Sequence, residues 1–402
     1  MSLAHGRPYL AIPGPSVIPD AVLQAMHRPA PNIYEGALPE MVGGMIPDLR
    51  YVAQTGGHVA IYITNGHGMW EAVLANTVAA GERVLVPATG RFGLGWADTA
   101  QAMGIEVDLI EHDRQSAIDP QRVRAALEAD KAHKIRAVLA VHVDTSTSVR
   151  SDVAALRAVL DDLQHPALLM VDCIASLACD EFRMDDWGVD VMISASQKGL
   201  MVPPGLGFAF FNDKAAEQRR AVAQVSRYWD WTNRANPEMF YQYFNGTAPT
   251  HHLYGLRVAL DMIKAEGMEA IWARHAALAG AIWTACDVWG SAGPLTLNIP
   301  DPSLRSHAVT SLRLGAPHGM RLREWADAQT GVTLGLGIGM SEPDDPNGTG
   351  FFRFGHMGHV SAHMILGLLG VVETGFAALD IPHGKGGVTA ATEFLAGVCA
   401  KG

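Results

Sequence analysis

The chain has 402 residues, of which 49% are hydrophobic and 18% are charged. This length exceeds the usual size of one hydrophobic core, and the apolar content excludes a disordered chain, so we expect two compact domains. The formal net charge of −11 argues against nucleic acid and anionic membranes as partners.

The sequence also indicates in which cellular compartment the protein is expected. Its start, MSLAHGRPYLAIPGP, lacks a basic region followed by an apolar run, so we expect no signal peptide. The apolar stretch Met364–Val372 is too short to span a bilayer. The four cysteines form no CxxC pair, which is typical of free thiols in a reducing compartment. We therefore expect a soluble, cytoplasmic protein.

The first half of the chain alternates short apolar runs with helical segments. Pro13-Gly14-Pro15 is a stiff extended segment that should rejoin the C-terminal part or line the site. Helices are expected over Trp70–Ala80 and Asp152–Leu163. The apolar, strand-like runs are Val59–Thr64, Val84–Pro87, Ala137–Val143, Ala167–Asp172, Val189–Ser194 and Gly207–Phe211. This alternation predicts an α/β fold with a mostly parallel sheet covered by helices, and ligands bind beyond the carboxyl ends of such strands.

The second half predicts a smaller α+β domain. Two long helices over His252–Gly267 and Met268–Gly290 are divided by Gly267 and lead into it. Its own elements are strands near Val309–Leu314, Val332–Leu336 and Phe351–Phe354, followed by a helix over Val360–Leu379. We expect an N-terminal segment at residues 1–20, a large domain at 21–255 and a small domain at 256–402.

Lys198 is the first candidate for chemistry, because the run Ser194-Ala195-Ser196-Gln197-Lys198-Gly199 follows a predicted buried strand. An amine there could form an imine with an aldehyde cofactor and later act as a base on a substrate carbon. A solvated loop lysine is the alternative for this motif alone. Asp172 ends another buried strand, where a carboxylate needs a cation such as a protonated pyridine nitrogen, although a helix-capping role is open. Together they fit one ring held at both ends.

Three further segments follow predicted strands. In Thr64-Asn65-Gly66-His67-Gly68-Met69 the glycines let backbone N–H groups approach a phosphate at a helix start. Phe92 could stack on a flat ring, or it could be an ordinary core residue. Thr145 could donate a hydrogen bond to a phenolic oxygen, or it could cap a helix.

These motifs lie in a chain that resembles the class V aminotransferases of fold type I, above all the serine–glyoxylate and alanine–glyoxylate enzymes. The similar runs include PGPSVIPDAVLQAMHRPA, HPALLMVDCIASL, FRMDDWGVDVMISASQKG and RFGHMG, and they extend over nearly the whole chain. The resemblance implies pyridoxal 5′-phosphate (PLP) as cofactor, a homodimer with its sites at the interface, and transamination between a small L-amino acid and a small 2-oxo acid such as glyoxylate or pyruvate. Serine or alanine is the expected donor, with aspartate a further option.

The resemblance also implies a role for each matching residue. Lys198 carries the cofactor as a Schiff base, and Asp172 pairs with the pyridinium nitrogen. Arg353 holds the substrate α-carboxylate, with Gly14 and Tyr34 on the substrate side. Around the cofactor are Ile174 and Phe92 against the ring, Thr145 near the phenolic oxygen, His67, Gly68, Met69 and Gln197 at the phosphate, and Thr247 reaching the phosphate of the partner subunit.

Some segments depart from the family pattern. His67 stands where relatives carry Ser or Thr, and residues 143–148 replace a segment that usually begins with Asn-Glu. Residues 32–36, Asn-Ile-Tyr-Glu-Gly, replace a loop containing His and Arg, and Ser341–Gly350 is longer and more acidic than usual. These departures affect the substrate wall rather than the cofactor core.

Other functions are weaker matches. A cysteine desulfurase would need a reactive cysteine near residue 340, and a pyridoxamine–pyruvate aminotransferase or another PLP-dependent lyase would use the same fold. For a desulfurase, the only cysteine late in the chain is Cys399. For a pyridoxamine–pyruvate aminotransferase, a second arginine is expected a turn before Arg353, and it is absent. Gly335-Leu336-Gly337-Ile338-Gly339 lacks the context of a nicotinamide site, and no histidine cluster predicts a metal. A catalytically inactive relative would not need both Lys198 and Asp172.

Overall fold

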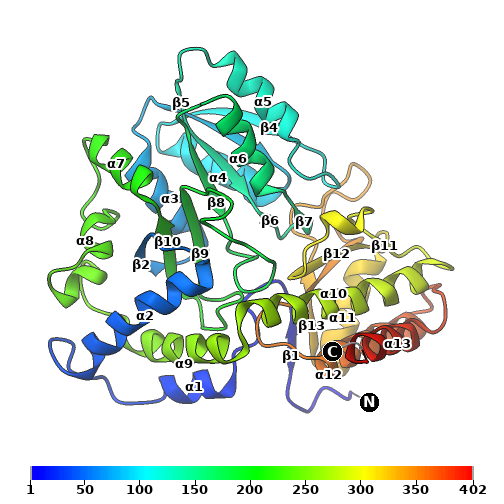
Figure 1. The fold of residues 1–402 in the computed structure, drawn as a ribbon. Helices are drawn as coiled ribbons and strands as arrows, with labels where there is room; N and C mark the ends of the chain where they lie inside the picture. The colour runs from blue at the N-terminus through cyan, green and yellow to red at the C-terminus, as the bar shows by residue number, and fades with distance from the viewer. Residues whose placement is uncertain (1, 401–402) are drawn as a thin grey trace.

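Seven strands form the larger of two main β-sheets in the computed structural model, which describes residues 2–400 (Figure 1). Their spatial order is β2-β10-β9-β8-β5-β3-β4. The strands are β2 (His58–Thr64), β3 (Arg83–Ala88), β4 (Glu106–Glu111), β5 (Ile135–Val141), β8 (Leu168–Asp172), β9 (Val191–Ala195) and β10 (Gly205–Phe211). β10 runs antiparallel to both of its neighbours, and the other pairs are parallel. The carboxyl ends of β2, β3, β5, β8 and β9 therefore lie at one edge.

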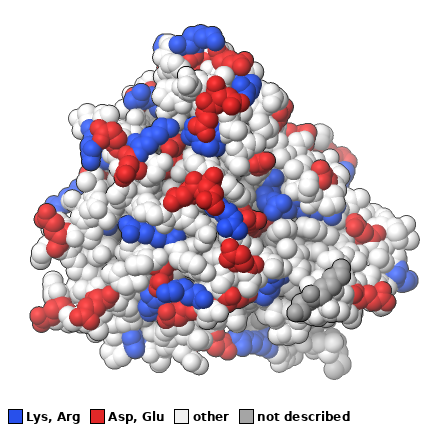
Figure 2. Space-filling model, in the orientation of Figure 1, with Lys and Arg blue, Asp and Glu red and all other residues white. Residues whose placement is uncertain are grey.

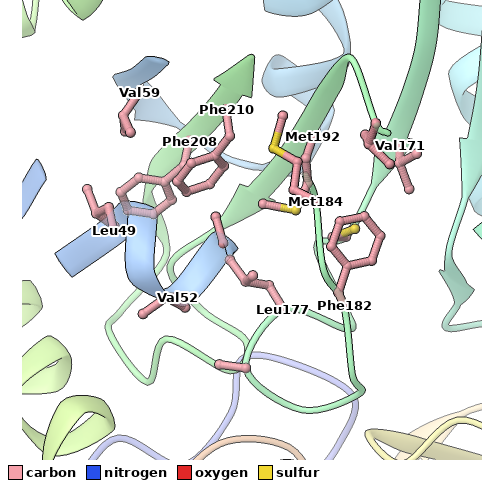
Figure 3. Packing of buried hydrophobic residues seen from close by; sticks show 14 of the residues in the cluster. Leu49, Val52, Val59, Val171, Leu177, Phe182, Met184, Met192, Phe208 and Phe210 are labelled. Carbon is pink, nitrogen blue, oxygen red and sulfur yellow. The ribbon is translucent and has the colours of Figure 1, made fainter. Parts of the chain in front are cut away.

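Helices cover both faces of this sheet, and each face has its own apolar core. Phe208 and Phe210 point into one core and Ala209 and Phe211 into the other, because successive side chains of a strand alternate between faces. Figure 3 shows Leu49 of α2 beside Phe208 in the first core. The helices are α1 (Asp20–Met26), α2 (Ala37–Ala53), α3 (Gly66–Thr77), α4 (Arg91–Ala102), α5 (Pro120–Ala129), α6 (Val153–Asp162), α7 (Asp213–Ala221), α8 (Thr232–Ala235) and α9 (Thr250–Glu266).

A second sheet has the order β1-β13-β14-β12-β11 and a separate core. Its strands are β1 (Tyr9–Ala11), β11 (Thr296–Leu297), β12 (Val309–Arg313), β13 (Val332–Leu336) and β14 (Phe351–Gly355), and its helices are α10 (Met268–Gly290), α11 (His318–Thr330), α12 (Ala362–Ala378) and α13 (Gly387–Cys399). The N-terminal segment rejoins this sheet as expected, since β1 pairs in parallel with β13. Short elements complete the chain: the hairpin β6 (Val143–Asp144) and β7 (Val149–Arg150), and the 3-10 turns η1 (Phe240–Tyr243) and η2 (Pro302–Leu304).

The helix after β2 begins earlier than the apolar pattern indicates. The predicted helix Trp70–Ala80 is α3, which starts at Gly66 and ends at Thr77. The side chain of Asn65 accepts a hydrogen bond from the N–H of Gly68 and caps it, so the glycine-rich turn is the first turn of a helix. Phe92 lies at the start of α4, a helix that was not predicted from the sequence.

The division into domains stays a prediction. The expected boundary at residue 255 lies inside α9, whose apolar residues belong to a core of the larger sheet. In α10, Trp272 belongs to that core and Leu278 belongs to the core of the second sheet. We propose that the two domains meet within α10.

The surface carries both signs of charge. Acidic and basic side chains are interspersed over the face in view in Figure 2. Within residues 2–400, no helix combines the length and apolar character that a membrane span requires.

Candidate active site

A cavity of about 280 Å³ lies at the carboxyl edge of the larger sheet. Asp172 ends β8, Lys198 follows β9, and these two strands are neighbours in parallel register. The predicted site residues that line this cavity are Gly14, His67, Phe92, Thr145, Asp172, Ile174, Gln197 and Lys198. The fold thus brings eight sequence-predicted residues from six separate segments to one place.

Asp172 is a buried carboxyl with only neutral hydrogen-bond donors. Its Oδ1 accepts a hydrogen bond from the N–H of Ile174 and its Oδ2 accepts one from the indole Nε1 of Trp70, both at 2.8 Å. Burial raises the pKa of Asp172 to about 6, against the opposing effect of these two donors. A cation at this position would favour the ionised form.

Lys198 extends into the cavity from the turn after β9. Its amine donates a hydrogen bond to the carbonyl oxygen of Pro13. Burial and then the positive charge of Arg353 lower the pKa of Lys198 to about 8. Gly14 makes room for this side chain, because a Cβ added there would lie 2.5 Å from the lysine Nζ. Glycine is also suited to the local backbone, whose φ is +94°.

The start of α3 forms one end of the cavity, but its N–H groups are not all free. The N–H of Gly68 donates to the Asn65 side chain and that of Met69 donates to the Asn65 carbonyl. The Met69 side chain is buried in the core below the sheet. Gly66 and His67 hold the helix-start N–H groups that would face an anion.

Phe92 and Thr145 lie on a wall that Asp144 organises. The Asp144 carboxylate accepts hydrogen bonds from the N–H groups of Phe92 at 2.9 Å and Gly93 at 3.2 Å, and from Ser146. It therefore caps α4 from outside that helix and ties it to the turn that contains Thr145. This buried carboxylate is held by donors on two segments.

Arg353 lies on β14 of the second sheet, behind Thr145, and is only 4% exposed. Its Nε donates to the carbonyl of Leu336 and its Nη1 to the carbonyl of Thr145, both at 2.6 Å. In the described chain its Nη2 makes no hydrogen bond. Burial lowers the pKa of Arg353 to about 10, while the charge of Asp144 raises it. The guanidinium joins the second sheet to the wall of the cavity without lining it.

Tyr34 and Thr247 are not brought into this cavity. Tyr34 is 86% exposed, in the segment between α1 and α2. Thr247 is exposed just before α9. Their predicted roles concern the substrate side and a partner subunit, and both stay predictions.

Comparison with known proteins fits this geometry. The family described as aminotransferase class-V matches residues 59–339. The chain belongs to the class V aminotransferases. It is 34% identical over 394 residues to a serine–glyoxylate aminotransferase of Arabidopsis thaliana, covering 97% of this chain and 96% of that protein. It is 34% identical over 387 residues to an L-aspartate–glyoxylate aminotransferase of Paracoccus denitrificans, covering 95% and 94%. The crystal structure of a ureidoglycine–glyoxylate aminotransferase of Bacillus subtilis has the same fold, with a TM-score of 0.87 and 24% identity over 98% of this chain and 99% of that one.

The aminotransferase is therefore a fold type I, PLP-dependent enzyme, and its cavity fits that cofactor. Asp172 is a buried carboxylate without a cation hydrogen-bonded to it, which suits a protonated ring nitrogen. The Oε1 atom of Gln197 is buried without a hydrogen-bond donor in the described chain. PLP, when bound, supplies an aldehyde that takes up an amino group and a ring that withdraws electrons.

Sequence reasoning about this aminotransferase missed two residues that hold the site. Trp70 was placed only as a helix residue, but a buried indole N–H needs an acceptor, and Asp172 is that acceptor. Asp144 was noted only as part of an unusual segment. An aspartate two residues before a serine is typical of an Asx turn, which could have indicated its role.

The lowered pKa of Lys198 predicts its reactivity without any assumption about the cofactor. We expect its labelling by fluorodinitrobenzene in the apo-protein to rise with pH through about 8, because the amine is protonated below its pKa and nucleophilic above it. An ordinary lysine side chain rises through about 10.4. Competitive labelling with mass spectrometry measures both, and a midpoint for Lys198 near the ordinary value would contradict this description of its environment.

Proposed function

We propose that the aminotransferase moves the amino group of a small L-amino acid, serine or alanine, to glyoxylate, with pyruvate as a further acceptor and aspartate as a further donor. The observation that carries this proposal is the pairing of Lys198 and Asp172 on adjacent strands at the wall of one small cavity. The two relatives described above, a serine–glyoxylate and an L-aspartate–glyoxylate aminotransferase, support glyoxylate as the acceptor.

In this proposal Lys198 holds PLP covalently at Nζ and later moves a proton at the substrate Cα. Asp172 pairs with the ring nitrogen of the cofactor, and its ionised form keeps that nitrogen protonated. Ile174 and Phe92 would pack against the ring, and Thr145 would bond the phenolic oxygen. The N–H groups of Gly66 and His67 and the amide of Gln197 would bind the phosphate, while Gly68 and Met69 complete the helix turn whose N–H groups bond to Asn65.

Arg353 orients the substrate in the same proposal. Its guanidinium is held by the carbonyls of Leu336 and Thr145, and its Nη2 is the nitrogen left for a carboxylate. A charge-assisted hydrogen bond from this fixed position sets where the Cα–H bond lies relative to Lys198. Gly14 completes the substrate side within the same protomer. Tyr34 would contribute to the substrate side of a partner subunit.

Replacing Lys198 tests the proposed attachment of PLP. We expect Lys198→Ala to lose the covalent adduct that borohydride traps in the parent enzyme and to lower kcat by roughly a thousandfold or more, because both the nucleophile and the base are removed. Lys131→Ala, at an exposed lysine, is the control and should retain both. Peptide mapping that finds the trapped cofactor on another lysine would show the assignment to be wrong.

Replacing Arg353 tests the carboxylate site. Arg353→Ala should lower kcat/KM for α-amino acids about a hundredfold, which is roughly 3 kcal/mol. Arg353→Lys should restore little, because a lysine ammonium cannot keep the contacts with the carbonyls of Leu336 and Thr145 that hold the guanidinium and also reach the carboxylate. The matched control is Arg313→Ala. Arg313 is a half-exposed arginine on the neighbouring strand β12, where it pairs with Glu342. Full activity of Arg353→Ala would contradict this role.

We also propose a homodimer with its active sites at the interface. Thr247 and Tyr34 are exposed and lie outside the cavity of their own protomer, which suits residues that contribute to the site of a partner. Met239, 61% exposed, and Tyr241, 48% exposed, add apolar surface shortly before Thr247. Such surface is typical of an interface.

Sedimentation and cofactor titration test the dimer. We expect the parent to sediment as a dimer and Thr247→Ala to weaken PLP binding about tenfold, because one hydroxyl donor to the phosphate is lost. Thr392→Ala, on an exposed face of α13, is the control. A monomer that holds PLP tightly would refute the proposal.

We further propose a cytoplasmic location, which suits the free thiols of Cys173, Cys179, Cys286 and Cys399. Fractionation of the source cells tests it, and recovery of the enzyme in an oxidising compartment would refute it.

A further inference from the structure

A second, larger cavity of about 810 Å³ adjoins the cofactor cavity, and His67 and Phe92 line both. It lies between the start of α4, helix α11 and the segment after β13. Arg91 and Arg323 line it, and none of its lining residues is acidic. In a chain with a formal charge of −11, this is a local concentration of positive charge beside the catalytic lysine.

Neither arginine forms a salt bridge among the described residues. Burial lowers the pKa of Arg323, although the charges of Glu324 and Asp327 on the same helix raise it. Arg323 makes no hydrogen bond in the described chain, and its Nε atom is buried without an acceptor. A buried guanidinium N–H without an acceptor destabilises the fold. An anion that enters this cavity would supply the acceptor that the protein does not provide. The stem of Arg91 is fixed against Gly339, where an added Cβ would lie 2.9 Å from the arginine Cβ.

Two of the three acidic side chains of the neighbouring segment are occupied elsewhere, and the third, Asp344, is exposed and does not line the cavity. Glu342 pairs with Arg313 at 2.7 Å. Asp345 accepts hydrogen bonds from the N–H groups of Thr349 at 2.9 Å and Gly350 at 2.7 Å. The unusually acidic segment therefore builds its own turn, and Asn347 and Thr349 are among the residues that face the cavity.

Arg323 is also electrostatically coupled to the proposed carboxylate site. Burial is the main cause that lowers the pKa of Arg353, and the charge of Arg323 lowers it further. Arg323 lies on α11, which packs on β14, the strand that carries Arg353. Two cations that destabilise each other in this way are both stabilised by a ligand with two negative groups.

We propose that Arg323, assisted by Arg91, forms a second anion subsite that binds the distal carboxylate of a dicarboxylic amino acid or 2-oxo acid. This inference rests on the proposed function and deepens it, because it assigns the residue that recognises the second carboxylate of aspartate, the further donor proposed above, and of four-carbon 2-oxo acids such as oxaloacetate. Arg353 holds the α-carboxylate, and Arg323 is the residue that distinguishes the dicarboxylic substrate.

The decisive variant is Arg323→Gln in the PLP-loaded enzyme, with Arg321→Gln as the matched control. Arg321 lies two residues away on α11, is exposed and does not line the cavity. We expect Arg323→Gln to lower kcat/KM for L-aspartate at least tenfold and to change kcat/KM for L-alanine less than about threefold, since a charge-assisted hydrogen bond is lost only for aspartate. Arg91→Gln should have a smaller effect of the same kind, and Arg321→Gln should have none.

A binding measurement separates this inference from the proposed function. Calorimetry with maleate and propionate compares a dicarboxylate with a monocarboxylate, and neither reacts. We expect the parent to bind maleate at least tenfold more tightly than propionate, and Arg323→Gln to remove this preference. If no amino acid is transaminated but the preference still depends on Arg323, the proposed function fails and the subsite stands. If alanine reacts with glyoxylate but Arg323→Gln leaves aspartate activity and maleate binding unchanged, the subsite is overturned alone.

Discussion

The site depends on burying an acid and an amine at the ends of two adjacent parallel strands. Burial raises the pKa of Asp172 to about 6 and lowers the pKa of Lys198 to about 8. One pKa unit corresponds to about 1.4 kcal/mol, so each group, when charged, destabilises the folded chain by on the order of 3 kcal/mol. The packed cores on both faces of the sheet offset this cost. In return, the amine is a nucleophile near neutral pH and the carboxylate is a strong partner for a cation.

The opposite wall connects the two sheets. Asp144 ties the start of α4 to the turn that contains Thr145, and Arg353 of the second sheet binds the carbonyl of the same Thr145. Phe92 on the cofactor side and Arg353 on the substrate side are therefore linked through one turn. A movement of the second sheet relative to the first would act on both contacts through this turn, so the proposed cofactor and substrate contacts are coupled.

Sequence reasoning predicts those residues of the site that lie at the ends of strands. A buried apolar run that stops at a polar residue marks the carboxyl edge of a sheet, and this reasoning located Lys198, Asp172 and the turn after β5. The direction of a strand cannot be predicted in this way. β10 is as apolar as the strands beside it, β2 and β9, but it runs antiparallel to both. The start of α3 was missed because two glycines obscured the cap at Asn65. Arg323 gave no signal, because a helical arginine usually belongs to a solvated face.

The positive charge around the cavity also couples substrate binding to proton transfer. Lys198 is kept largely unprotonated above pH 8 by burial and by the field of Arg353. A carboxylate that binds to Arg353 cancels part of that field, and buried charges are screened little by solvent. In the proposed mechanism the amine then becomes more basic when the substrate Cα–H is in place. Arg353 would thereby both orient the substrate and strengthen the base, because both effects arise from one buried charge.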